Sequence, residues 1–457
     1  MLRAIALLAA GLAIPGAAAD LRVGRAAVKI TPPAGIPMAG YYSVRLAEGT
    51  LDDLHAKALV IELNGAKAAM VACDVVSLER DIVEQARKLA EERTGIPAAQ
   101  ILISATHSHT GPLMHKRLIA PAPPAAQKLA LAYRAALPGK IADAIKAADS
   151  ALGPAQASRA AGREDSISFY RRFLMKDGTV KTNPGKANPD IVQPMGEIDP
   201  EVAVVRFDSP DGKPQAAYVN FSLHLDTTGG PQFSADYPAT LAKLLGKIHG
   251  PDLLTMFTIA AAGNINHVDV KSKEPQKGPA EARRIGTILA GEVIKAMARL
   301  QPVDAANLRF AREVLTLPMR SANDAEVAKA KEIAAQINRK PQPPFLDLVQ
   351  SFAVLNAHDL GKLEAEVQVI ALGDKVAWVG LPGEIFVELG AAIKKASPFP
   401  QTIIVELANG TLRYVPTKKG FAEGAYEATN SLCAPGGGEQ LADTAIRLLA
   451  QAYRAGR

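Results

Sequence analysis

The sequence predicts an α/β fold in which mostly parallel mixed sheets are flanked by helices. Apolar runs of strand length alternate with segments of helical apolar spacing through much of the 457 residues. The hydrophobic content of 48% and the charged content of 21% are sufficient for a large buried core. Because ligands in such folds bind at the carboxyl ends of the strands, we expect an active site at that edge of the sheets.

Each expected element has a local signal. Apolar runs that end at polar or turn residues predict strands, and one such run ends at Asp74. Helices are predicted where apolar residues recur every three or four positions; Gly95 ends one of them, and Pro238 is tolerated in the first turn of another. The expected strands are 21–30, 68–73, 101–103, 202–208, 216–223, 253–262, 363–372, 377–380 and 402–407. The expected helices are 81–94, 128–151 with a break or kink at Pro138, 237–249, 280–300, 322–337, 385–396 and 440–453, and 180–197 is expected to be a long loop.

The N-terminal segment has the features of a secretory signal peptide. Arg3 supplies a positive charge, residues 4–14 form an apolar stretch, and Gly16-Ala-Ala-Ala offers small residues for cleavage. We therefore expect residues 1–19 to be removed and 20–457 to form one domain that is periplasmic or secreted; a retained anchor is the alternative. Export permits a disulfide between Cys73 and Cys433, but Cys73 ends an apolar run and is better explained as a small buried residue.

The formal net charge is +6, from 52 basic and 46 acidic residues, and it is not gathered into a basic block. Proteins that bind nucleic acid usually carry a basic patch or stripe, so we expect no nucleic-acid partner. The excess still allows a weak attraction to anionic surfaces, such as a peripheral membrane contact. The sequence leaves the oligomeric state open.

The stretch 103–112 reads Ile-Ser-Ala-Thr-His-Ser-His-Thr-Gly-Pro and places His107 and His109 where a predicted strand ends. Residues two apart in a strand share a face, so both imidazoles can point into one cleft. Neutral imidazole is a good zinc ligand, and a His-x-His pair is a common start of a metal site. The alternative is that both are polar loop residues that cap the strand.

Further side chains that could bind a metal lie at other strand boundaries. His55 lies near the start of a predicted strand. The others lie where predicted strands end: Asp74, His224, His267, Asp269 and Glu384. Parallel strands would bring these exits to one sheet edge, where the side chains could share one ion. Each residue taken alone has a simpler explanation. Glu384 could lie at a helix N-terminus and be stabilised by the helix dipole. Asp74 could cap a turn instead of orienting a ligand histidine. The remaining histidines, expected to be exposed or structural, are His115, His249 and His358.

Five short motifs, in order along most of the chain, resemble those of the neutral/alkaline non-lysosomal ceramidase family of zinc-dependent amidases. They are Ala105-Thr-His-Ser-His-Thr-Gly-Pro, Asn220-Phe-Ser-Leu-His, Leu381-Pro-Gly-Glu, Arg413-Tyr-Val-Pro-Thr and Ala425-Tyr-Glu-Ala-Thr. The resemblance implies a divergent bacterial-type member whose catalytic domain occupies 20–457, without the C-terminal β-sandwich domain of the family.

The resemblance also implies roles for individual residues. The zinc ligands it implies are His107, His224, Glu384 and Tyr414. Zinc-bound water would be the nucleophile, with His109, Arg171 and Tyr426 placed to stabilise the oxyanion. Arg172 is the alternative match for Arg171, and Leu54-His55 matches an Ile-His near the site of the family.

One loop departs from the family pattern. Where the family has Gly-Asp-Val-Ser-Pro-Asn, this chain has Gly263-Asn-Ile-Asn-His-Val, so Asn264 replaces an aspartate and Asn266 replaces the catalytic serine. An amide cannot act as a nucleophile, although it can orient a substrate by hydrogen bonds. His267 stands in place of the proline and could transfer protons, with Asp269 as a further titratable group nearby.

The sequence therefore predicts an exported hydrolase that uses zinc to cleave an amide bond in a small-molecule or lipid-like substrate. Because the serine is replaced by Asn266, an alternative is a metal-dependent hydrolase of a different ester or of a sugar-derived amide. The other alternative is a non-catalytic metal-site binding protein. A Gly-x-Ser-x-Gly elbow, a P-loop and a dinucleotide fingerprint are absent from the sequence.

Overall fold

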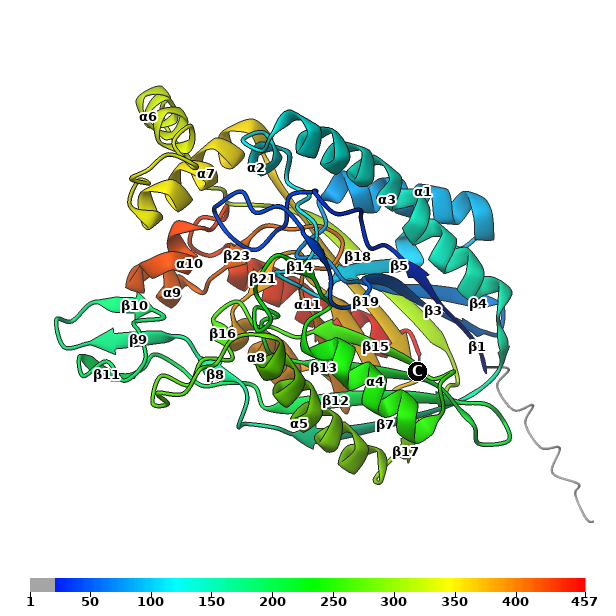
Figure 1. The fold of residues 1–457 in the computed structure, drawn as a ribbon. Coiled ribbons are helices and arrows are strands. Elements are labelled where there is room, and N and C mark those ends of the chain that lie inside the picture. The colour runs from blue at the N-terminus through cyan, green and yellow to red at the C-terminus, as the bar shows by residue number, and fades with distance from the viewer. Residues whose placement is uncertain (1–20, 457) are drawn as a thin grey trace, which may run out of the picture.

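The computed structural model describes residues 21–456, and its main strands form three large mixed sheets (Figure 1). One face of each sheet contributes to a shared core that contains Ile61, Tyr218 and the fully buried Trp378. Helices pack against the opposite faces. The mixed α/β class predicted from the sequence is thus confirmed.

The first sheet has the strand order β5-β4-β3-β1-β6 and is covered by two helices. Its elements are β1 (Leu21–Lys29), β3 (His55–Leu63), β4 (Ala66–Cys73), β5 (Ile101–Ala105), β6 (Gly153–Pro154), α1 (Arg80–Thr94) and α3 (Pro124–Ser150). Only β4 and β5 pair in parallel. A break or kink was expected at Pro138, and the break is wrong, because α3 continues through this residue.

The second sheet has the order β15-β13-β12-β7-β17, with β13 and β15 as its parallel pair. Its elements are β7 (Gln156–Arg163), β12 (Glu201–Asp208), β13 (Pro214–Phe221), β15 (Leu254–Ile259), β17 (Gln301–Pro302), α4 (Tyr237–His249) and α5 (Pro279–Met297). The third sheet, β18-β19-β20-β22, has β20 and β22 as its parallel pair. Its elements are β18 (Leu308–Leu317), β19 (Leu363–Leu372), β20 (Val376–Gly380), β22 (Gln401–Val405), α8 (Val387–Ala396) and α11 (Gly437–Arg454).

The large sheets contain less parallel pairing than the sequence suggested. Antiparallel pairs predominate because several consecutive strands are joined by tight turns instead of helical crossovers. Asn64 and Gly65, both with positive φ, form the turn between β3 and β4, which is an Asn-Gly hairpin signal in the sequence. The smaller share of parallel pairs does not change where the site is expected. Each large sheet contains one parallel pair, and the site is expected at the carboxyl ends of such strands.

Smaller elements extend from the sheets. The segment 180–197, predicted to be a loop, contains two short strands that pair with β9 in a small sheet at the left of Figure 1. A helical hairpin of α6 and α7 lies at the upper left, and α7 is not among the helices predicted from the sequence. The bounds of these elements are β9 (Arg172–Met175), β10 (Val180–Thr182), β11 (Ile191–Pro194), α6 (Asp324–Ala334) and α7 (Phe345–Leu360). The remaining elements are β2 (Gly49–Thr50), α2 (Lys116–Ile119), β8 (Phe169–Tyr170), β14 (Gln232–Phe233), β16 (Ile265–Asn266), β21 (Glu384–Ile385), β23 (Tyr414–Val415), α9 (Lys418–Glu423), α10 (Ala425–Thr429) and a 3₁₀ turn over Ala98–Gln100.

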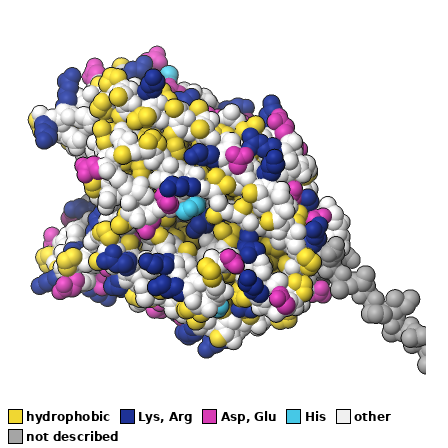
Figure 2. Space-filling view, turned by 45° about the vertical axis from the view of Figure 1, so that its right-hand side comes forward, with side chains coloured by type: hydrophobic (Ala, Val, Ile, Leu, Met, Phe, Trp, Pro, Cys, Tyr) yellow, Lys and Arg dark blue, Asp and Glu magenta, His cyan; other side chains and the backbone are white. Residues whose placement is uncertain are grey.

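The signal peptide expected over 1–19 lies outside the described residues. Within residues 21–456, no helix has both the length and the apolar character required to cross a bilayer. Cys73 and Cys433 are both buried and free, so they do not form a disulfide with each other. Lys and Arg side chains are scattered over the face shown in Figure 2, while hydrophobic side chains gather in its upper part.

Candidate metal centre

His107 follows β5 and is turned out of the strand by an unusual backbone conformation. Its φ is +76°, in the left-handed region that a residue with a side chain seldom adopts. The ring Nδ1 lies 2.8 Å from the carbonyl oxygen of Val76, and since a carbonyl can only accept, Nδ1 must carry the proton. The Nε2 lone pair of His107 is therefore free to face the site.

His224 follows β13 and is oriented in the same way. Its Nδ1 donates to the carbonyl oxygen of Ala262 over 3.0 Å, which leaves its Nε2 facing inward. Fixing one ring nitrogen by a backbone carbonyl is the usual way in which proteins orient an imidazole ligand. His107 and His224 thus reach the site from two different sheets.

Glu384 comes from the third sheet, in the loop that follows β20. The short strand β21 pairs in parallel with β23, in a register that places Glu384 beside Tyr414. The loop after β15 packs closely against this strand, because a Cβ at Gly263 would lie 2.4 Å from the Glu384 carbonyl oxygen. Each parallel pair of the large sheets therefore ends next to one component of the site.

These side chains meet at short distances. Glu384 Oε2 lies 3.4 Å from Nε2 of His107 and 3.2 Å from Nε2 of His224. Nε2 of His109 lies 3.1 Å from Nε2 of His107. One nitrogen from each of the three histidines lies within 4.8 Å of the others, so this buried histidine group could hold a metal ion.

The surroundings of the Glu384 carboxylate indicate whether a metal ion fits this site. Its buried Oε2 has no hydrogen-bond partner, although it faces two imidazole nitrogens. Burial tends to raise the pKa of this carboxyl, but positive charge on the side of His107 and His224 holds it well below its usual range. A carboxylate that faces nitrogen lone pairs needs a cation between them, and imidazoles with a carboxylate suit zinc or a similar ion.

The protonation of the histidines agrees with this assignment. Burial lowers the pKa of His109 to about 4. Burial, assisted by the positive charge of Arg171, lowers the pKa of His224 to about 3. Both rings are therefore neutral at pH 7, which is the form in which imidazole binds a metal.

Arg171 lies at the edge of this group, between β8 and β9. Its Nη1 lies 3.3 Å from Nε2 of His224, and the guanidinium is held by the Glu427 carboxylate (2.9 Å) and the Gly263 carbonyl (2.7 Å). The alternative match, Arg172, points instead to Glu423 and Glu427. Arg171 lines the cavity, whereas Arg172 does not.

Two tyrosines border the same space. The rings of Tyr414 and Tyr426 lie 5.2 Å apart, and the Arg171 guanidinium lies 5.2 Å from the Tyr414 ring centre. Burial raises the pKa of both phenols well above the usual range, so both are neutral at physiological pH. Neutral phenols can donate hydrogen bonds to a substrate oxygen.

Some candidates from the sequence do not reach the centre. Asp74 accepts hydrogen bonds from the His55 backbone N–H (2.9 Å) and the Thr106 hydroxyl (3.5 Å), so it connects the end of β4 to neighbouring segments and is not the partner of His107. His55 and Asp269 do not line the cavity, and Asp269 caps the N–H of Lys271 instead. Asp269 is engaged by a backbone donor two residues ahead, whereas Asp74 accepts from the first residue of the neighbouring strand β3.

His267 does line the cavity. Its Nε2 donates to the carbonyl oxygen of Gln276 over 2.6 Å, which leaves Nδ1 as a buried acceptor without a partner. Asn266 donates to the Oδ1 of Asn183 (2.6 Å) and accepts from the Val268 N–H (2.9 Å). The loop that departs from the resembled family is thus part of the cavity wall.

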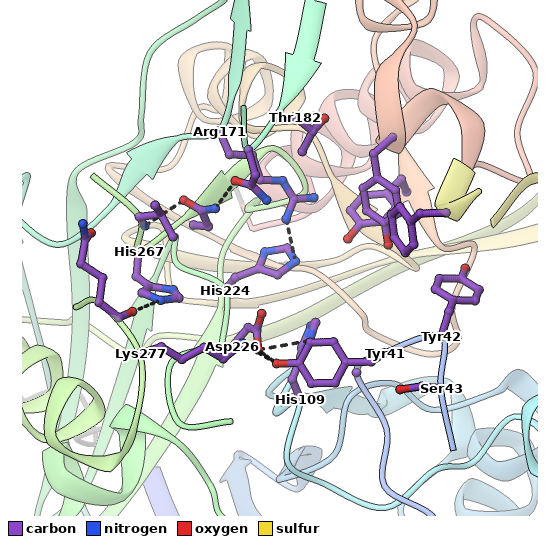
Figure 3. Close-up of a pocket in the computed structure, with 18 of the residues that line it drawn as sticks. Tyr41, Tyr42, Ser43, His109, Arg171, Thr182, His224, Asp226, His267 and Lys277 are labelled. Carbon is purple, nitrogen blue, oxygen red and sulfur yellow. Dashed lines mark hydrogen bonds and ion pairs between the residues drawn. The ribbon is translucent and has the colours of Figure 1, made fainter. Parts of the chain in front are cut away.

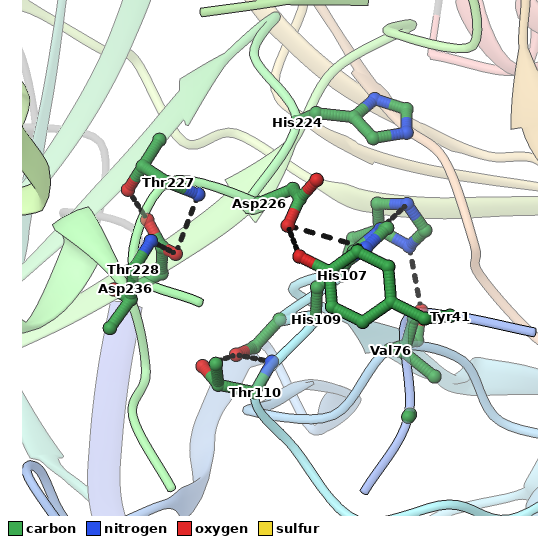
Figure 4. A network of polar contacts seen from close by, with 12 residues as sticks. Tyr41, Val76, His107, His109, Thr110, His224, Asp226, Thr227, Thr228 and Asp236 are labelled. Carbon is green, nitrogen blue, oxygen red and sulfur yellow. Dashed lines mark hydrogen bonds and ion pairs between the residues drawn. The ribbon is translucent and has the colours of Figure 1, made fainter. Parts of the chain in front are cut away.

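Sequence reasoning missed a polar group beside His109 (Figure 4). Asp226 Oδ1 lies 3.8 Å from His109 Nδ1, accepts from the Tyr41 hydroxyl, and lies 3.2 Å from Lys277 Nζ. Burial would raise the pKa of Asp226, but His109 and Lys277 lower it to about 2. The only sequence signals were the position of Asp226 two residues after His224 and the Pro/Gly-rich loop before Tyr41.

Two members of this histidine group, His109 and His224, line a cavity of about 710 Å³ (Figure 3). In this view His224 lies between Lys277 and His267 on one side and Tyr42 on the other. A cavity of this size can enclose a small organic molecule or the reacting end of a longer one.

No protein-family model and no curated protein sequence matches the chain. Among solved structures, neutral ceramidase from Pseudomonas aeruginosa is similar with a TM-score of 0.75 and 18% identity, over 95% of this chain and 75% of that one. The fold is ceramidase-like. A structure described as ceramidase complexed with C2 matches with a TM-score of 0.73 and 18% identity, over 95% of this chain and 76% of that one. The ceramidase resemblance inferred from the motifs is therefore confirmed for the fold.

Proposed function

We propose that this protein is an exported zinc-dependent hydrolase of an amide bond. The observation that carries the proposal is the buried Glu384 Oε2, which faces His107 and His224 without a hydrogen-bond donor. The ceramidase-like fold supports the reaction class, because the solved structures that match it are ceramidases. The apolar leader in residues 4–14 supports export to the periplasm or the medium.

The proposed zinc ligands are His107, His224, Glu384 and Tyr414. The pairing of Tyr414 with Glu384 across β21 and β23 supports the fourth ligand. His109 is near enough to be an alternative, since its Nε2 belongs to the same histidine group. Metal content of His109→Ala and Tyr414→Phe separates the two: the variant that loses a true ligand loses affinity for zinc.

Zinc bound at this centre would polarise the scissile carbonyl and lower the pKa of water to about 7. Arg171 and Tyr426 would donate to the developing oxyanion, each such donor being worth about 3–4 kcal/mol. His109, held toward Asp226, would hydrogen-bond the same region of the substrate. The unpartnered Nδ1 of His267 would accept a proton during the reaction.

Asn266 favours a substrate other than ceramide. Its side chain has no hydroxyl, and both ends of its amide are engaged by Asn183 and Val268. This supports a second candidate, a metal-dependent hydrolase of a different ester or amide. The proposed substrate is therefore a small or lipid-like carbonyl compound, and a binding protein without catalysis is the remaining alternative.

The experiment is metal analysis combined with a substrate panel. Purified protein should contain about one zinc per chain, the number that one four-ligand site holds. His107→Ala should lose both the metal and the hydrolysis of amides in a panel that includes N-acyl sphingosine, esters and phosphates. Full metal content without turnover of any carbonyl substrate would leave the binding protein as the function.

A further inference from the structure

Two lysines lie on one side of the cavity. Lys186 and Lys277 come from adjacent loops, which are tied together by the hydrogen bond from the Ala187 N–H to the Val270 carbonyl (2.7 Å). Lys186 Nζ donates to the backbone carbonyl of Glu274 (2.6 Å), and within residues 21–456 it makes no ion pair with a carboxylate. Its ammonium is thus available to an anion in the cavity.

The other charges of the cavity do not compensate Lys186. Asp226 is the carboxylate among the lining residues, and it is already engaged by Lys277 and the Tyr41 hydroxyl. The charge of Arg171 is matched by Glu427 behind the wall. A cavity lined with an excess of one charge concentrates ligands of the opposite charge.

The opposite side of the cavity is aromatic. Phe345 stacks on Tyr426 with ring centres 5.6 Å apart and an interplanar angle of 24°, and it meets Tyr42 edge-on at 6.0 Å. Phe345 is 55% exposed, so part of its ring is available to a ligand. In Figure 3 the labelled Lys277 and Tyr42 lie on opposite sides of His224.

Between the two sides, the wall offers amide groups. Asn183 and Asn266 are hydrogen-bonded to each other, and each retains further donor capacity toward the cavity. A ligand that spans the site would therefore meet aromatic rings at one end and amides and ammonium groups at the other.

We propose that the substrate is an acylated amine that carries an anionic group, a carboxylate or a phosphate, close to the scissile amide. The apolar acyl group packs on Phe345 and Tyr426, and the anion is held by Lys186, with Lys277 nearby but still paired with Asp226. Hydrolysis adds water across the C–N bond and gives a carboxylic acid and an amine that retains the anion, with no redox change. This inference rests on the amidase function proposed above.

The test compares matched amides with full-length zinc-loaded protein. N-hexanoylglycine and N-hexanoyl-O-phosphoethanolamine carry the two anions, N-hexanoylethanolamine is their neutral counterpart, and a short-chain N-acyl sphingosine represents ceramide. We expect at least one anionic amide to have a kcat/KM about tenfold above the neutral one at low salt, with the advantage decreasing at high salt. The better of the two anions identifies the group.

Lys186→Ala is the decisive variant, because Lys186 bonds only to backbone carbonyls and its loss disturbs no other side chain. It should raise KM for the anionic amide about threefold to tenfold and leave the neutral amide unchanged. Lys271→Ala is the matched control, since Lys271 is exposed in the same loop region but does not line the cavity.

A second readout separates this inference from the amidase proposal. The binding of N-hexanoylglycine is measured by calorimetry with zinc-free protein. Without zinc, neither turnover nor coordination of the ligand by the metal contributes to the measured affinity. Weaker binding by Lys186→Ala but not by Lys271→Ala supports the anion site even if no amide is hydrolysed, in which case only the amidase proposal fails. Preference for the neutral amides, or equal effects of Lys186→Ala on charged and neutral ligands, overturns the inference.

Discussion

The base of the cavity and its wall are built in different ways. The base, a name used here for His107, His224 and Glu384, adjoins the cavity, and His224 lines it directly. All three residues follow buried strands and are fixed through backbone groups. The wall consists of Asn183, Lys186, Asn266, His267 and Lys277, which lie in loops or, for Asn266, in the two-residue strand β16. They are held largely by other side chains or by loop carbonyls. The departures from the ceramidase motifs that line the cavity, at Asn266 and His267, fall in the wall. Chemistry can thus be retained at the base while recognition changes in the wall.

The largest effect is expected from Glu384→Gln, which tests the role of the base. Without metal, the buried Oε2 lacks a donor, whereas a Gln amide could donate to the neighbouring imidazole. We expect the zinc-free variant to be more stable than the wild type by about 1–3 kcal/mol. We expect its zinc affinity to decrease by more than about 100-fold, so the order of stabilities should reverse in excess zinc.

Unfolding in urea with chelator and with zinc provides the measurement for Glu384→Gln. Asp226→Asn, which changes a carboxylate beside the base but outside the proposed ligand set, is the control. If Glu384→Gln unfolds at the same urea concentration as the wild type under both conditions, the carboxylate is not a metal ligand.

The next largest effect concerns Glu406, which joins two parts of the base. This residue follows β22, is fully buried, and its Oε2 accepts from the N–H groups of Ala262 (3.1 Å) and Ile385 (2.7 Å). Ala262 provides the carbonyl that orients His224, and Ile385 follows Glu384. Glu406→Ala leaves two buried donors unsatisfied and should cost about 2–5 kcal/mol of unfolding free energy.

Glu406→Gln is the matched variant, because its amide oxygen can replace Oε2 as the acceptor. It should retain most of the stability and the zinc content in a chelator-competition assay. Equal losses in Glu406→Gln and Glu406→Ala would show that the charge or proton of the carboxyl, and not its acceptor geometry, matters.

The third effect is a pH dependence of stability in the zinc-free protein. Burial lowers the pKa of His109 to about 4 and of His224 to about 3, against about 6.5 in an unfolded chain. Between these values the unfolded chain binds more protons than the folded one, so stability is complete above about pH 6.5 and decreases as the pH falls. From pH 7 to pH 5 the decrease should be about 2 kcal/mol for each histidine.

Urea unfolding across this pH range measures the effect. His224→Gln should remove about half of the contribution of the pair, and His358→Gln, a change of an exposed histidine, is the control. A pH profile that is unchanged in His224→Gln would mean that His224 takes up its proton at the same pH in the folded and the unfolded chain.

The same contrast explains what could be predicted from the sequence. His107, His224 and Glu384 lie within short motifs directly after apolar strands, so strand order and motif together brought them to one place. Lys186, Asp226 and Phe345 have no such local signal. Asn183 and Asn266, for example, are 83 positions apart and meet only because β8 pairs with β16 and orders the adjoining loops.

The fold shows the same limit. The large helices other than α7 and most long strands follow from apolar periodicity, but periodicity does not state which strands pair or in which direction. The hairpin at Asn64-Gly65 was a local signal for antiparallel pairing, whereas the parallel neighbours β20 and β22 are separated by α8. Whether two strands pair in parallel or antiparallel is therefore determined by the segment that joins them, which the apolar pattern of the strands does not describe.

The smallest effect is expected in the wall, from Asn266→Ser, which restores the residue of the resembled family. It removes the hydrogen bond to Asn183, a contribution of about 0.5–1.5 kcal/mol. Zinc content and kcat should be close to those of the wild type, with KM changed less than about tenfold, and Asn183→Ala should give a similar change by breaking the same bond. Steady-state kinetics on the best amide of the panel provides the measurement. An increase in kcat of several orders of magnitude in Asn266→Ser alone would show that a hydroxyl at this position takes part in catalysis, and the wall could then no longer be assigned to recognition alone.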